Sequence, residues 1–75
     1  MTNHNYVGTL IKKARAKKKM SRFDLVVEME KRGYAASIET LRNWEKLNSS
    51  PGPEALNVIA SILETPIEKF FKAVA

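Results

Sequence analysis

Apolar residues recur at helical spacing along this chain of 75 residues, and no segment alternates apolar and polar residues as a strand does. Two segments carry the complete i, i+3, i+4, i+7 pattern, which places one apolar stripe on a helix. The two stripes are Val7, Leu10, Ile11 and Ala14, and Leu56, Ile59, Ala60 and Leu63. Because short helices are stable only when such faces pack together, the pattern predicts a bundle of short helices.

A capping box and a glycine delimit a second helix, which we expect over residues 21–32. Ser21 is followed three residues later by Asp24, a pair that satisfies two backbone N–H groups at a helix N-terminus. Gly33 ends the helix, as glycine often does at a helix C-terminus.

A third helix is expected over residues 37–46, where Ser37 is a good N-cap and Leu41 and Trp44 point inward. Stacking of Trp44 on single-stranded nucleic acid is the alternative, but its spacing from Leu41 favours the core. Two prolines and a glycine make residues 47–53 the clearest loop of the chain.

The last part of the chain predicts two further helices. The fourth begins at about Glu54 and carries the second apolar stripe. Thr65 and Pro66 then read as an N-cap and a proline at the first helical position of a fifth helix. Of its two aromatic residues, Phe70 and Phe71, one is expected in the core and the other as a dimer contact. The fold class is therefore all-α, with five short helices around one core.

Composition excludes several kinds of site and of protein. The chain has no cysteine, so disulfides and thiolate zinc sites are excluded. Its single histidine, His4, lies in a polar tail over residues 1–6, which argues against a histidine metal site or triad. The three glycines stand apart, so no phosphate-binding loop exists. We expect no enzyme activity, no metal and no cofactor. With no signal peptide and no run of about 18 apolar residues, we expect a cytoplasmic protein.

The basic residues cluster more than the formal net charge of +5 suggests. Seven of the thirteen lie in one short segment: Lys12, Lys13, Arg15, Lys17, Lys18, Lys19 and Arg22. A basic stripe is the electrostatic footprint of a polyanion binder. A solvated helix face and a helix lying on an anionic membrane surface are the alternatives.

Three motifs, taken in order, point to a known family. The second helix opens Ser-Arg-Phe-Asp-Leu-Val from Ser21, and the third runs Ser-Ile-Glu-Thr-Leu-Arg-Asn-Trp-Glu from Ser37. Pro51, the second apolar stripe and the Thr65 cap follow. Over roughly residues 7–71 this arrangement resembles the phage-repressor, or XRE-type, helix-turn-helix family. The resemblance implies a compact lambda-repressor-like domain over residues 7–75, with the second and third helices as its DNA-binding pair.

The connection between these two helices departs from the family. Residues 30–36 make it several residues longer than the usual tight turn. We expect either a longer second helix or an extended loop that Tyr34 anchors. The resemblance also implies an ion pair between Arg15, late in the first helix, and Glu45, which closes the third. We therefore interpret Arg15 as a structural residue.

A third helix in the major groove would turn one set of side chains toward the bases. That set is Ile38, Glu39, Arg42 and Asn43. Asparagine pairs with adenine, arginine with guanine, and glutamate accepts from cytosine, while isoleucine packs on a thymine methyl. For Arg42 a phosphate is the alternative target. The expected phosphate contacts are Ser21, Arg22, Ser37, Thr40, Lys46, Asn48 and Ser49. For Ser37 a purely capping role is the stronger alternative.

The sequence thus predicts a sequence-specific double-stranded DNA-binding regulator. The resemblance implies a repressor of bacterial, phage or mobile-element origin that binds a palindromic operator as a homodimer. One alternative is the antitoxin of a toxin–antitoxin pair, with a protein partner on the fourth and fifth helices. Another is a helix-turn-helix used for protein–protein interaction alone, which the uncompensated lysines disfavour. A role on a membrane surface is the remote alternative.

Overall fold

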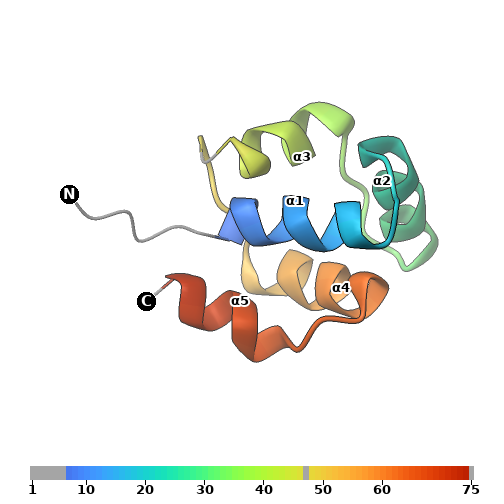
Figure 1. Cartoon of the computed structure of the whole chain (residues 1–75). Coiled ribbons are helices and arrows are strands. Elements are labelled where there is room, and N and C mark those ends of the chain that lie inside the picture. The colour runs from blue at the N-terminus through green and yellow to red at the C-terminus, as the bar shows by residue number, and fades with distance from the viewer. Residues whose placement is uncertain (1–6, 47, 75) are drawn as a thin grey trace.

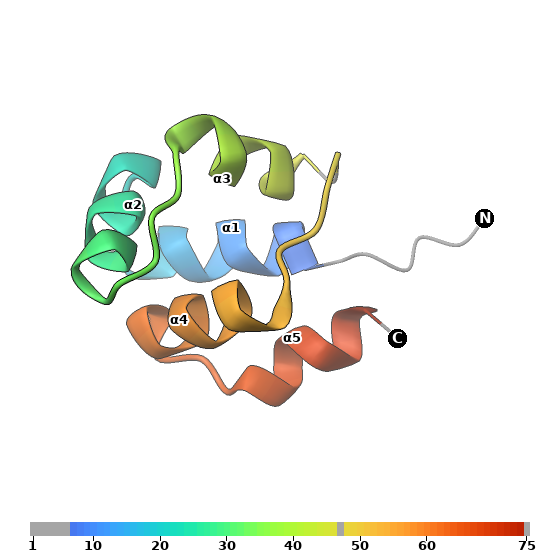
Figure 2. The ribbon, with the colours of Figure 1, turned by 180° about the vertical axis from the view of Figure 1, so that it is seen from behind.

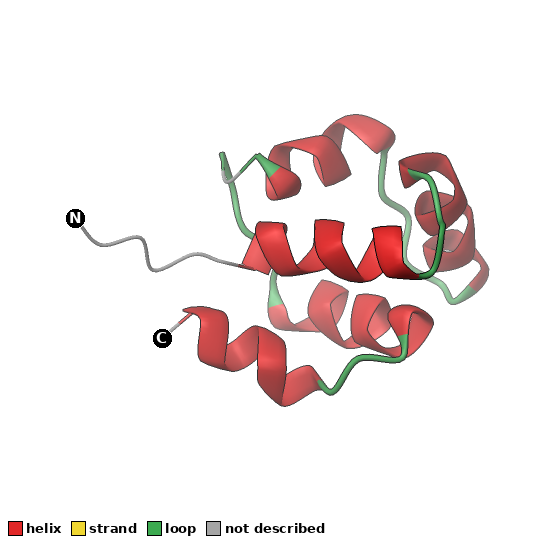
Figure 3. Ribbon diagram, viewed as in Figure 1, coloured by secondary structure: helices red, strands yellow, loops and turns green. Residues whose placement is uncertain are grey.

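All regular structure in the described part of the chain is helical (Figure 3). The computed structural model describes residues 7–46 and 48–74, with side chains as far as residue 70. Its helices are α1 (Val7–Lys17), α2 (Arg22–Lys31), α3 (Ile38–Glu45), α4 (Pro53–Leu63) and α5 (Ile67–Val74). The expected all-α fold of five helices is confirmed. The tail over residues 1–6, Leu47 of the loop and the side chain of Phe71 lie outside the described part.

Helix α1 is the central element of the bundle. It packs against α3 on one side and against α4 and α5 on the other, so that it separates α3 from α5 (Figure 1). Helix α2 closes one end by packing on α3 and α4, and the reverse view shows the same order (Figure 2). No helix within residues 7–46 and 48–74 combines the length and the apolarity that crossing a membrane requires.

Both apolar stripes face the core, but to different extents. Every member of the α4 stripe is buried, together with its neighbours Ala55 and Ile62. In α1, Val7 and Ile11 are buried, whereas Leu10 and Ala14 are half-buried at the edge of the core. The inward positions expected for Leu41, Trp44 and one of the two phenylalanines are confirmed, since Leu41, Trp44 and Phe70 are all buried.

Local hydrogen bonds set both ends of α2. The expected capping box is present: the Ser21 hydroxyl accepts from the Asp24 N–H, and the Asp24 carboxylate accepts from the Ser21 N–H, each at 3.0 Å. At the other end Gly33 adopts φ 91°, a left-handed conformation that glycine tolerates, and the Tyr34 N–H bonds back to the Met29 carbonyl at 3.0 Å. The connection to α3 is thus a loop whose half-buried Tyr34 packs on the core.

The expected start of the fifth helix is wrong. Helix α5 begins at Ile67, so Thr65 is not its N-cap. Thr65 belongs to the end of α4 instead, because its N–H donates to the Ala60 carbonyl at 3.0 Å and its hydroxyl donates to the Leu63 carbonyl at 3.2 Å. The turn depends on Glu64, which adopts φ 53° and reverses the chain.

A glycine allows α1 to approach α3 closely. A Cβ added to Gly8 would overlap the carbonyl oxygen of Trp44 and would lie 3.0 Å from the Cα of Glu45. These atoms belong to the backbone at the end of α3, so they cannot move aside as a flexible side chain can. Gly8 therefore determines how near the end of α3 lies to α1.

We predict that Gly8→Ala lowers the free energy of unfolding by at least about 2 kcal/mol. Forcing the two helices apart costs more than the roughly 1 kcal/mol that alanine gains over glycine within a helix. Urea unfolding followed by Trp44 fluorescence measures the change. Gly52→Ala is the matched control, since a Cβ there meets nothing within 4 Å. Equal losses in the two variants would refute this account of Gly8.

Candidate nucleic-acid interface

Helix α3 has one face fixed in the core and one face open to solvent. Leu41, Trp44 and Glu45 are buried. The residues expected to contact bases lie on the other face, where Ile38 and Glu39 are exposed and Arg42 and Asn43 are half-buried. Ile38 leaves 37% of its surface exposed. The structure thus brings the four expected base contacts together on one surface.

The buried face of α3 ends in an ion cluster. The Glu45 side chain is 1% exposed, and its carboxylate accepts from Arg15 Nε at 2.9 Å and from Arg15 Nη2 at 3.2 Å. The same carboxylate accepts from Arg22 Nε at 3.0 Å. The ion pair expected between Arg15 and Glu45 is thus present, and Arg22 joins it as a second partner.

Arg15 also ties the cluster to the chain that leads into α2. Its Nη1 donates to the Met20 carbonyl at 2.8 Å, just before the Ser21 cap. Removing one partner of a buried ion pair leaves a desolvated charge without compensation, whereas the complete cluster gives both oxygens of the Glu45 carboxylate a donor. Among the described side chains no buried nitrogen or oxygen lacks a hydrogen-bond partner. The cluster therefore holds α1, α2 and α3 in one relative position.

A second ion pair lies on the exposed face of α3. Arg42 Nη1 donates to Glu39 Oε1 at 2.9 Å, with side-chain exposures of 41% and 69%. An exposed pair of this kind adds little to stability. It does orient the guanidinium, so two of the expected base contacts form one unit and Glu39 already has a donor.

Two of the expected phosphate contacts, Ser21 and Arg22, lie at the N-terminus of α2. The capping box takes up the N–H groups of Ser21 and Asp24. In that turn the N–H groups of Arg22 and Phe23 then lack an intrahelical acceptor. Arg22 lies at the same end, half-buried against Glu45, with 32% of its side chain exposed. Phosphate binding there would use these two N–H groups and the outer edge of the Arg22 guanidinium.

The remaining expected phosphate contacts fall into two groups. Ser37 and Thr40 are engaged at the start of α3: the Ser37 hydroxyl accepts from the Thr40 N–H at 3.0 Å, and the two hydroxyls lie 2.9 Å apart. Lys46, Asn48 and Ser49 are exposed just past the end of α3. The Asn48 N–H donates to the Asn43 carbonyl at 3.0 Å, which holds this segment against the helix.

The basic stripe seen in the sequence is divided in the structure. Arg15 and Arg22 are held by Glu45, and Lys18 Nζ lies 3.0 Å from Glu64 Oε1. Lys12 follows Gly8 by one helical turn, on the side of α1 toward α3. Lys13 and Lys17 lie on the opposite flank, beside α5. The stripe is therefore divided: Arg15 and Arg22 belong to a structural cluster, and Lys12 lies on a different flank of α1 from Lys13 and Lys17.

Two features of these surfaces have no signal in the local sequence. The second role of Arg22 has no local signal, because its partner Glu45 is remote in the sequence and reaches it only through the packing of α2 on α3. Lys69 lines the same hollow as Lys13 and Lys17, yet it belongs to α5 and lies outside the basic segment. Only the contact between α1 and α5 brings these lysines together.

The chain matches no protein-family model, and comparison with curated proteins and with solved structures found no similar protein.

We predict that Glu45→Ala lowers the free energy of unfolding by about 3 kcal/mol, because it leaves two arginines without their shared acceptor. Glu39→Ala is the matched control on the exposed face of the same helix and should cost less than about 1 kcal/mol. Urea unfolding of both variants measures the difference. If the two losses were equal, the Glu45 cluster would not be what holds α3 in place.

Proposed function

We propose that the chain is a sequence-specific double-stranded DNA-binding domain of the phage-repressor, or XRE, type, with α3 as its recognition helix. In this proposal it represses transcription by occupying an operator in the cytoplasm, and it uses neither catalysis nor a cofactor. The observation that carries the proposal is the division of α3 into a rigidly anchored face and a polar face. A recognition helix needs both, since base readout requires side chains held in a fixed register.

The four outward side chains have distinct roles in this proposal. The Asn43 amide pairs with an adenine, and the Arg42 guanidinium pairs with a guanine. Glu39 acts mainly by orienting Arg42, because the two are already hydrogen-bonded at 2.9 Å. Ile38, which exposes an apolar surface at the start of α3, packs on a thymine methyl.

Register on the duplex comes from groups on either side of α3. At one end are Arg22 and the N–H groups of the first turn of α2, where the helix dipole favours a phosphate. At the other end are Lys46 and the exposed segment that contains Asn48 and Ser49. Contacts of this kind fix orientation without reading sequence.

Selection from a randomised duplex library at near-physiological salt tests this function. We expect one enriched motif, and a log–log slope of affinity against salt near about −5 if roughly six phosphates are neutralised. A palindrome with half-sites about one helical turn apart would indicate binding as a dimer, and a single short site would indicate a monomer. No enriched motif together with a slope near zero would eliminate DNA binding as the main activity.

Two variants separate base readout from phosphate contact. Asn43→Ala should relax the base preference at one position, with a loss of about 1–3 kcal/mol of discrimination. Lys46→Ala should weaken binding to all sequences alike and reduce the salt slope by about one. Quantitative binding to the selected site and to its single-base variants measures both effects. A loss of base discrimination in Lys46→Ala equal to that in Asn43→Ala would contradict these assignments.

A further inference from the structure

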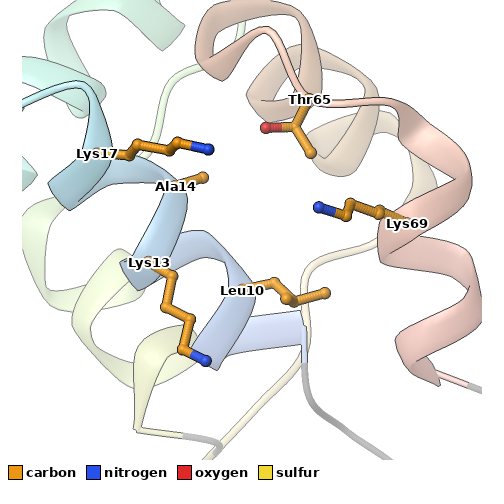
Figure 4. A pocket seen from close by; sticks show the side chains of 6 residues that line it. All are labelled: Leu10, Lys13, Ala14, Lys17, Thr65 and Lys69. Atoms are coloured by element: carbon orange, nitrogen blue, oxygen red, sulfur yellow. The ribbon is translucent and has the colours of Figure 1, made fainter.

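A shallow groove separates α1 from the start of α5, on the opposite side of α1 from the recognition helix (Figure 4). Its volume is about 310 Å³, and it is open to solvent along one side. Side chains from both walls line it: Leu10, Lys13, Ala14, Lys17, Thr65 and Lys69. The groove continues past Lys17 toward Glu64 and Pro66 at the end of α4.

The floor of the groove is apolar. Leu10 and Ala14 belong to the buried stripe of α1, yet α5 leaves both of them half-buried. They are one helical turn apart and therefore present one continuous strip to the groove. A ligand that places an apolar side chain on this strip would complete the burial of the stripe.

The rims of the groove are basic. Lys13 and Lys17 stand on the α1 side and Lys69 on the α5 side, and the amino groups of Lys17 and Lys69 point toward each other across the opening (Figure 4). Within the side chains that the structure describes, no ion pair engages any of the three. Lys13 and Lys17 are spaced i, i+4 on α1, where like charges repel, and Glu64 at the far end of the groove is paired with Lys18 at 3.0 Å rather than with these lysines.

We propose that this groove binds an acidic, amphipathic peptide segment of a partner protein. An apolar side chain of the segment lies on Leu10 and Ala14, and flanking carboxylates pair with the lysines on the two walls. An apolar floor between basic rims matches this ligand, whereas a sugar–phosphate backbone would leave the floor unused. The open side suits an extended segment better than a small molecule, which pockets bind by enclosing it.

Fluorescence anisotropy with the full chain and a labelled peptide that alternates leucine with glutamate tests the proposal. We expect saturable binding, weakened at least about tenfold when Lys17→Glu and Lys69→Glu are combined. The matched control combines Lys12→Glu with Lys19→Glu, which change the net charge equally at exposed positions that do not line the groove. The control should weaken binding by no more than about twofold, as expected for screened charges at a distance. Amide chemical-shift changes should concentrate on the two walls of the groove.

Several outcomes would overturn the proposal. Equal weakening in the groove and control variants would show attraction to net charge alone. If a peptide in which serine replaces every leucine bound as tightly as the original, the apolar floor would not contribute to binding. Displacement of the peptide by duplex DNA, with loss of duplex binding in the groove variant, would assign the lysines to a nucleic-acid surface. The peptide assay needs no DNA binding, so it stands whether or not α3 reads a duplex.

Discussion

The carboxylate of Glu45 is the point at which three helices are held together. It lies at the end of α3 and accepts hydrogen bonds from Arg15 of α1 and Arg22 of α2, while Arg15 also binds the Met20 carbonyl between them. Gly8 adds the second constraint, because its missing side chain lets the backbone of α1 reach the end of α3. A buried charge satisfied from two directions tolerates little displacement, so this end of α3 has one position.

Because the buried face of α3 anchors the helix, the residues on its outer face can change without loss of that anchor. Helix α3 contributes Leu41, Trp44 and Glu45 to the buried interior, whereas its residues Glu39, Arg42 and Asn43 lie outside the core. Substitutions on the outer face can therefore change what is recognised without unfolding the domain. The proposed DNA readout depends on this arrangement, in which one set of residues holds the helix in place and another set contacts the bases.

The position of α1 between α3 and α5 divides the charge of the molecule. A helix presents its residues in all directions, so adjacent lysines such as Lys12 and Lys13 fall on different flanks. One flank borders the proposed DNA surface, and the other borders the groove that Lys69 completes. The lysines that contribute to the net charge of +5 thus lie on opposite sides of α1. The net charge by itself therefore does not indicate which surface binds a ligand.

The sequence by itself determined the elements that depend on neighbouring residues. The five helices follow from apolar spacing, and the Ser21 capping box and the end of α2 at Gly33 follow from local hydrogen bonding and backbone freedom. The tertiary structure decided which remote segments come together. It places Arg22 beside Glu45, brings the backbone at Gly8 close to the end of α3, and sets Lys17 opposite Lys69 across the groove. It also joins Thr65 to the end of α4 rather than to the start of α5. The reason is physical, because periodicity and caps act within a few residues, whereas burial and charge pairing depend on which helix faces lie together.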